Sequence, residues 1–488
     1  MTPRRDREPT PMPRIPRQRP AEPGTKAGTK AGPRAGPGSG PGSGTKTAAA
    51  ESSSGPHEPV RVLVVDLAAG AVPRLSTPDG EPADCPAGAV LALVRHAGTP
   101  VGLLDLELPT ADPDELVARA LARFGTPAAA PEPPRYPAAG PRVSVIVATR
   151  ERPEQLAACL RTLVWQTYPD LELIVVDNAP TTSRTASVVR GGCAGLVRYV
   201  CEPRAGLAVA HNRGIAAATG ELLAFTDDDV LADPGWVAAL VAGFAKPSRP
   251  GCVTGLILPA ELRTPAQLML HHHGGYAKGF APVLYDGRVP PAADPLFPFT
   301  AGRFGSGANM AFRADVLREL GGFDPATGVG TPARGGDDLL AFFRTIVRGH
   351  RIGYEPGALI WHRHRADPAA VVRQVRGHGT GLGAYLTAAV LREPRMLGAL
   401  ARRLPGGIRY ALARTRAPGR PEVPWPASLI GLERRALAAG PPAYVRSRMR
   451  MRGVCAPWKE EPGGRTRAGD GAQAPDRAWP GDQAGPGR

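Results

Sequence analysis

The chain has 488 residues, enough for two or three domains and a sizeable core. Its net charge of +16 lies at the ends: residues 1–50 carry ten Lys and Arg against three acids, and residues 402–452 carry twelve Arg against two acids. The near-neutral middle excludes a basic nucleic-acid-binding body. No run of about 18 apolar residues predicts a membrane span, and no apolar stretch follows the basic N-terminus as in a secretory signal.

Both ends of the chain are predicted to be disordered. Residues 1–58 form a basic Pro/Gly-rich tail, and residues 456–488 are Gly, Pro and charge. The six cysteines lack paired metal-binding spacing, which favours free thiols in a reducing compartment, so we expect a cytoplasmic protein. The basic 402–452 segment allows two interpretations: a solvated surface, or peripheral contact with anionic lipid on the inner face of the membrane.

Strand and helix patterns then define the domains in chain order. Residues 59–125 combine short strand patterns with one helical pattern, predicting a small α+β appendage, and residues 126–141 predict a linker. From residue 142, apolar strands are predicted over 143–149, 171–176, 197–201 and 221–225, with helices between them. Near-continuous apolar strands with helical crossovers predict an α/β fold, with a mostly parallel sheet covered by helices on both faces.

The second half continues this pattern less regularly. Extended segments are predicted over 252–258, 308–312 and 351–361, and helices over 314–320 and 337–347. Between them lie a polar stretch over 263–303, where His271–His273 predict a polar loop, and a Gly-rich loop over 321–336. The main domain is predicted to span 142–367, followed by a basic helical extension over 368–455.

Polar residues follow several of the predicted strands. Thr149, Asp177 and the run Asp227–Asp229 lie at strand ends, where parallel α/β sheets gather their ligands. Three adjacent carboxylates tolerate one another in water or around a cation, so the run predicts a divalent metal site that holds phosphate. For Asp177, capping of a turn and a hydrogen bond to a base or ribose are equally supported.

Two further groups could add chemistry to this edge. Asp337 and Asp338 begin a predicted helix, where the helix dipole favours acids, but capping needs only one acid. One of these carboxylates is therefore a candidate general base. His362 and His364 share one face of an extended segment, so one of them could complete the metal site.

Taken together, these residues resemble family 2 glycosyltransferases of the GT-A fold, from about residue 142 to 365. The order of the matching segments along the chain is the family's order. The segments are 143–152, 175–178, 210–214, the Asp-x-Asp of Asp227 and Asp229, 307–313, 321–324, 336–338 and 361–365.

The resemblance implies roles for individual residues. Asp338 would be the catalytic base, with Asp337 beside it where family members usually have Glu. Asp229 would bind Mn²⁺ or Mg²⁺ directly, with Asp227 and either His362 or His364 close to the metal. The implied nucleotide- and donor-binding residues are Thr149, Glu151, Asp177, Asn212, Asp227, Asp228 and Asn309.

The implied activity is that of an inverting glycosyltransferase of the hexosyltransferase type (EC 2.4). It would move a sugar from a UDP, GDP or dTDP donor to a hydroxyl of a saccharide or lipid-linked acceptor. One alternative is a nucleotidyltransferase that makes sugar nucleotides, but residues 148–153 lack the glycine-rich loop typical of that class. The other is a non-catalytic GT-A-like protein that binds a ligand or a membrane surface.

Overall fold

The structure, a computed structural model, describes residues 58–67, 72–126, 140–192, 195–274, 276–414 and 425–454. Nearly all of the predicted tails and linker, together with Cys193, Cys455 and part of the basic 402–452 segment, lies outside these ranges. The other four cysteines are free thiols.

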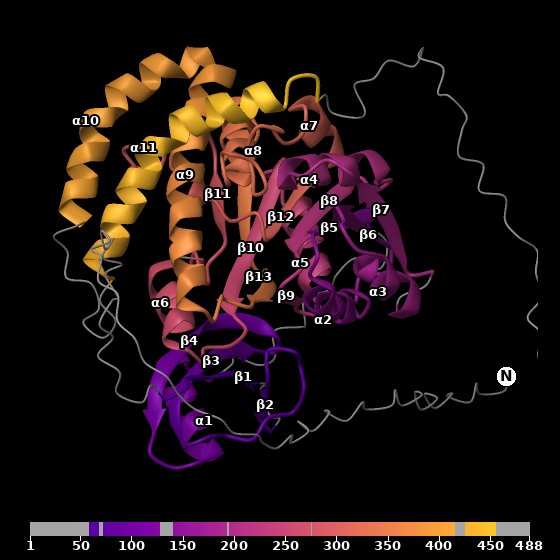
Figure 1. Cartoon of the computed structure of the whole chain (residues 1–488). Helices are drawn as coiled ribbons and strands as arrows, with labels where there is room; N and C mark the ends of the chain where they lie inside the picture. Colours follow the sequence, from indigo (N-terminus) through magenta and orange to yellow (C-terminus); the bar gives the residue numbers. More distant parts are fainter. Residues whose placement is uncertain are drawn as a thin grey trace, which may run out of the picture. The chain divides into compact units, whose positions relative to one another are not determined.

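A nine-stranded sheet organises the main domain (Figure 1). Its strands follow the order β11-β13-β10-β12-β8-β5-β6-β7, and β9 pairs with β13. β7, β6, β5 and β8 run parallel, and β12 runs antiparallel between β8 and β10. The bounds are β5 Val143–Thr149, β6 Leu171–Asn178, β7 Val197–Glu202, β8 Leu222–Asp227, β9 Val230–Ala232, β10 Cys252–Pro259, β11 Val283–Tyr285, β12 Asn309–Arg313 and β13 Ile352–His362.

Helices cover both faces of this sheet, which confirms the predicted α/β class. Val143, Val145 and Val147 of β5 point to one face, where α2, α3 and α5 pack, and Ile146 points to the other, where α4 and α8 pack. This alternation places apolar side chains in a core on each side of the sheet. The helix bounds are α2 Pro153–Leu163, α3 Arg184–Gly192, α4 Leu207–Ala217, α5 Trp236–Ala245, α7 Ala314–Glu319 and α8 Asp337–Val347.

A second, four-stranded sheet lies near the N-terminal end of the described chain, with order β2-β1-β3-β4 and one helix, α1. Asp112 caps this helix through the backbone N–H of Asp114, and Pro113 suits its first turn. Val62 and Leu93 of this sheet share a buried cluster with Leu256 of β10. The bounds are β1 Arg61–Leu67, β2 Arg74–Ser76, β3 Gly88–His96, β4 Thr99–Leu108 and α1 Pro113–Phe124.

The last part of the described chain is helical, and α9 packs against α8 and α11. No helix in the described ranges is long and apolar enough to cross a membrane. The bounds are α9 Pro368–Arg392, η2 Pro394–Met396, α10 Leu397–Arg414 and α11 Ala427–Arg450.

The polar stretch over 263–303 is more ordered than the sequence predicted. It contains α6 Pro265–Gly274, β11 and the short 3₁₀ helix η1 Ala301–Arg303. His271–His273 therefore lie on a helix, and the prediction that they form a polar loop was wrong. The amide of Gln267 bonds to the backbone of Arg263 and His364, so contacts distant in sequence hold this segment in place.

Candidate active site

The predicted polar residues meet at one edge of the sheet. β8, β5 and β6 are neighbouring parallel strands, so their carboxyl ends lie together. Thr149 is in register with Asp177 across β5 and β6, and Asp227 is in register with Ala148 across β8 and β5. Strand pairing thus places three polar residues side by side, although they are spread over 79 residues of the sequence.

The three aspartates after β8 have different surroundings. Asp228 is buried and accepts a hydrogen bond from Thr149 Oγ1 at 2.7 Å, and it also pairs with Arg152. Burial raises the pKa of Asp228 to about 7, against the opposing charge of Arg152. Asp228 therefore connects the Asp227–Asp229 turn to the end of β5.

Asp227 and Asp229 meet His362 instead. One ligand atom from each of the three residues lies within 4.8 Å of the others. Asp229 is buried, and its Oδ1 lies 3.3 Å from His362 Nε2 but accepts no hydrogen bond from the described residues. A buried carboxylate oxygen with no hydrogen bond, beside a second acid and an imidazole, fits a divalent cation.

The short strand β9 explains why His362 arrives here. Val230 is paired with His362 in the antiparallel β9–β13 ladder, and the N–H of Arg363 donates to Asp229 O at 3.0 Å. His364 lies one step further, with its Nδ1 3.2 Å from Nδ1 of His362. Of the two histidines left open by the sequence, His362 is the one beside the acids.

The positively charged neighbours of Asp229 keep its carboxylate ionised. Burial alone would raise the pKa of Asp229, but His362 and Arg152 outweigh it and hold that pKa well below its usual range. The same pairing raises the pKa of His362 despite its burial. Burial and the neighbouring His362 lower the pKa of His364 to about 3, so His364 stays neutral.

Asp337 and Asp338 lie in the first turn of α8, directly after Gly336. Gly336 has φ of 86°, and a Cβ there would lie 2.6 Å from Gly381 O, so this position requires glycine. Asp338 accepts hydrogen bonds from the N–H of Gly307 at 2.9 Å and from its neighbour Leu339 at 2.8 Å. Asp337 is buried, 3.6 Å from Nδ1 of His211.

The pKa of Asp338 suits a proton acceptor near neutral pH. Burial raises it to about 6, with further contributions from the charges of Asp337 and Asp227, and the two backbone hydrogen bonds oppose the shift. Because the charge of Asp227 contributes to the raised pKa of Asp338, the two carboxylates interact electrostatically. A carboxylate with a pKa near the working pH is typical of general bases.

Two other predicted residues lie beside this edge. Asp177 is fully buried and accepts a hydrogen bond from Tyr199 Oη at 2.8 Å, while its Oδ1 accepts none from the described residues. Burial raises the pKa of Asp177. Glu151 instead accepts hydrogen bonds from Thr181 and Thr182, which lower its pKa to about 2, so its carboxylate orders the loop after β6.

Asn212 and Asn309, the two asparagines predicted to bind the donor, lie inside the protein. The Asn212 amide bonds to the backbone N–H and C=O of Phe323. Asn309 is fully buried, accepts from Trp236 Nε1 at 2.8 Å and donates to Leu256 O and Ala358 O. Both amides therefore join elements of the core, and the donor-binding role predicted for them stays a prediction.

Replacing Asn309 with Ala should therefore destabilise the protein by about 3 kcal/mol, since three buried partners would lose their hydrogen bonds. Urea unfolding would measure this, with the exposed acid change Asp315→Ala as a control that leaves stability nearly unchanged. Unchanged stability together with weaker nucleotide binding would support the predicted donor-binding role.

Comparison with known proteins agrees with this arrangement. Residues 144–321 match the family model described as glycosyl transferase family 2. This segment resembles the family 2 glycosyltransferase domain. The match includes the ends of β5, β6 and β8 and stops before α8 and β13, so it does not cover Asp338 and His362.

Several known proteins are similar to parts of this chain. A pre-mycofactocin glycosyltransferase of Mycobacterium tuberculosis is 29% identical over 285 residues, which cover 57% of this chain and 55% of that protein. A glucosyl-dolichyl phosphate glucuronosyltransferase of Haloferax volcanii is 27% identical over 46% of this chain and 69% of its own length. The chain thus spans about half the length of the first relative. Among solved structures, a mannosyltransferase of Pyrobaculum calidifontis in complex with GDP-Man and Mn²⁺ gives a TM-score of 0.39 at 21% identity, covering 66% of this chain and 89% of that one.

Sequence reasoning missed several residues of this candidate site. Arg152 bridges Asp228 and Asp229, and Arg365 lies 3.5 Å from Asp229 Oδ2. His211 approaches Asp337, and Tyr276 stacks on His362. Arg152, His211 and Arg365 fall inside segments that carry the family resemblance, which was the available signal. Tyr276 lies in the variable 263–303 stretch and had none.

Proposed function

We propose that this chain transfers a sugar from a nucleotide-diphospho-sugar to an acceptor hydroxyl, with inversion at the anomeric carbon. The observation that carries this proposal is the meeting of two sets of acids at one sheet edge. Asp227, Asp229 and His362 form a cluster suited to a divalent cation. Asp338 accepts a hydrogen bond from Gly307, whose neighbour Ala308 accepts one from Thr226, the residue before Asp227. The family 2 domain match supports the same reaction class.

Asp227, Asp229 and His362 would hold Mn²⁺ or Mg²⁺. When bound, such an ion offsets the negative charge that develops on the leaving diphosphate. Arg152 pairs with Asp228 and Asp229, so it holds the two acids in place and keeps Asp229 ionised. Thr149 adds a hydrogen bond to Asp228 from the end of β5.

Asp338 would accept the proton of the acceptor hydroxyl. The acceptor oxygen forms the new bond to the anomeric carbon as the bond from that carbon to the donor diphosphate breaks, and the nucleoside diphosphate leaves. The N–H groups of Gly307 and Leu339 orient the carboxylate at the start of α8. Asp177, with one buried oxygen free, would accept a hydrogen bond from the nucleotide base or ribose.

The names of the two relatives point to different acceptors, so they do not identify the acceptor of this chain. A saccharide and a lipid-linked acceptor both remain proposals. Contact of the 402–452 segment with an anionic membrane and a cytoplasmic location also remain predictions.

Replacing His362 with Gln should weaken Mn²⁺ binding by about 10–100-fold. The amide is a poorer metal ligand than imidazole, and the change also removes the imidazole that lies beside Asp229. Isothermal titration with Mn²⁺ would measure this. His350→Gln is the matched control, since His350 pairs with Glu319, outside the cluster. Equal Mn²⁺ affinity of the His362 variant and the control would remove His362 from the metal site.

The experiment that tests the proposed function is calorimetric titration of UDP, GDP and dTDP into the full chain, with and without Mn²⁺. Metal-dependent binding of one nucleotide would identify the donor class. Failure of all three with folded protein would favour a non-catalytic GT-A-like protein, which is the strongest alternative.

A further inference from the structure

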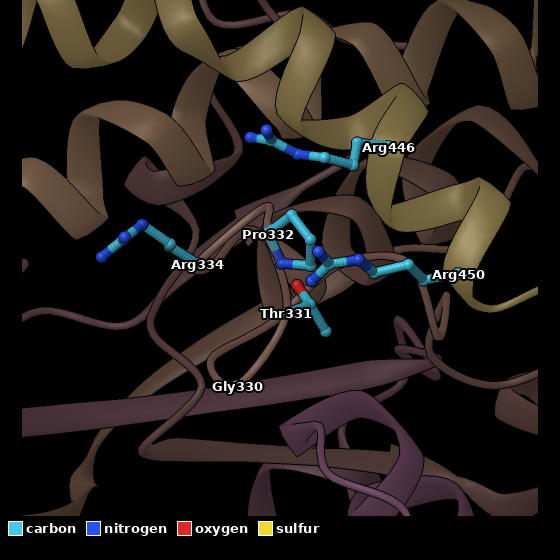
Figure 2. A pocket seen from close by; sticks show the side chains of 6 residues that line it. All are labelled: Gly330, Thr331, Pro332, Arg334, Arg446 and Arg450. Atoms are coloured by element: carbon cyan, nitrogen blue, oxygen red, sulfur yellow. The ribbon is translucent and has the colours of Figure 1, made fainter.

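A cationic cavity of about 330 Å³ lies away from the acid cluster, between the 328–335 loop and α11. It is lined by Gly330, Thr331, Pro332, Arg334, Arg446 and Arg450, and we call it the arginine cavity (Figure 2). Figure 2 shows Arg446 and Arg450 projecting from α11 and Arg334 from the loop. None of the residues that form the predicted metal site lines it.

The arginines of this cavity lack acidic partners. Within the described ranges, the structure records no hydrogen bond or ion pair for the guanidinium groups of Arg334, Arg446 and Arg450. Arg446 and Arg450 are four residues apart on α11, a spacing at which like charges repel. All three side chains are exposed, and an anion bound beside Arg446 and Arg450 would offset the repulsion between their like charges.

The loop connects this cavity to the candidate base. The two ends of the loop, which we call its neck, are joined by a hydrogen bond from the N–H of Gly328 to Gly335 O at 3.1 Å. Gly336 and Asp337 are the next two residues of the chain. A Cβ at Gly328 would lie 3.3 Å from Cγ of Asp337, so the neck touches the acid pair of α8. Arg334 and Asp338 are four residues apart, which limits their Cα separation to about 14 Å.

We propose that the arginine cavity binds a phosphate group of the acceptor substrate. This inference rests on the proposed function and names the substrate class for the same site. Guanidinium groups bind phosphate oxygens through paired hydrogen bonds, so Arg446 and Arg450, four residues apart on α11, are the side chains proposed to hold it. The donor diphosphate is not the ligand, because its proposed place is the Asp227, Asp229 and His362 cluster, which shares no residue with the cavity.

The test uses pyrophosphate as the probe, titrated calorimetrically into the full chain in the presence of EDTA. EDTA removes divalent ions, so the acid cluster cannot hold the probe through a metal. The cavity variant is Arg446→Gln/Arg450→Gln. Its matched control is Arg435→Gln/Arg448→Gln, which removes the same charge from exposed positions of the same helix that do not line the cavity.

We expect wild type and control to bind pyrophosphate equally and the cavity variant to bind about tenfold or more weakly. Its Mn²⁺-dependent nucleotide binding should match the wild type, which also shows that it is folded. Equal pyrophosphate affinity in all three proteins would overturn the proposal.

Two further measurements separate the sources of phosphate and the two proposals. Flotation with phosphatidylcholine vesicles containing phosphatidylglycerol should give the same result for the cavity variant and its control. Vesicle binding lost only in the cavity variant would overturn the acceptor assignment in favour of a bilayer phospholipid. Absence of nucleotide binding by the wild type, with pyrophosphate binding still dependent on the cavity, would overturn the proposed function and the acceptor assignment but not the anion site.

Discussion

Replacing Asp229 with Asn is expected to abolish Mn²⁺-dependent nucleotide binding and to lower the release of nucleoside diphosphate from the donor by about 10³-fold or more. The amide keeps the size of the side chain but loses the charge, and several kcal/mol of charge stabilisation would leave with the metal. Asp229 is the member of the cluster that contacts His362, Arg152 and Arg365 together. Titration of the nucleotide with and without Mn²⁺, followed by donor turnover, measures the effect.

The control for this change is Asp233→Asn, four residues further along the chain. Asp233 pairs with Arg95 at 2.5 Å and lies outside the acid cluster, so its loss removes an ion pair without touching the site. Thermal unfolding of both variants separates lost binding from lost folding. Mn²⁺-dependent binding that survives in folded Asp229→Asn would exclude Asp229 as the metal ligand.

Replacing Asp338 with Asn is expected to lower transfer by about 10²–10⁴-fold while nucleotide binding stays unchanged. The base acts on the acceptor, and the donor is proposed to bind the cluster after β8. Asn presents an NH₂ group where Gly307 or Leu339 now donates, so Asp338→Ala should be measured beside it. The matched control is Asp315→Asn, which removes an exposed acid from the first turn of α7.

The pH profile gives a second test of Asp338. A general base acts when ionised, and burial raises the pKa of Asp338 to about 6, so wild-type activity should fall as the pH drops through about 6. Burial also raises the pKa of Asp228, to about 7, so a second group titrates nearby. In Asp338→Asn, the residual activity should no longer fall as the pH drops through about 6. Full transfer by both Asp338 variants would remove Asp338 as the base.

The strands and the polar residues at their ends could be predicted because both depend on local pattern. The apolar run over 143–149 matches β5 residue for residue, and the run predicted over 351–361 is β13, shifted by one residue. A strand buried on both faces needs a continuous apolar run, which is visible in the sequence. Parallel strands then bring their carboxyl ends together, so the meeting of Thr149, Asp177 and Asp227 also followed from the sequence.

The roles of single polar side chains could not be predicted in the same way. Asn212 and Asn309 fall in family-like segments, yet their amides bond within the core to residues up to 111 positions away. Which partner a buried amide finds depends on elements that the chain brings near only after folding. The same holds for Arg152, whose acids lie 76 and 77 residues further along.

The sequence alone predicted the α/β class and the sheet edge at which the polar residues gather, because these follow from apolar periodicity and strand direction. Only the tertiary structure decided which histidine faces Asp229, since that depends on the pairing of β9 with β13. It also decided that Arg334, Arg446 and Arg450 line one cavity, although more than a hundred residues separate Arg334 from the other two. Such encounters are set by long-range packing, whose partners leave no periodic trace in the sequence.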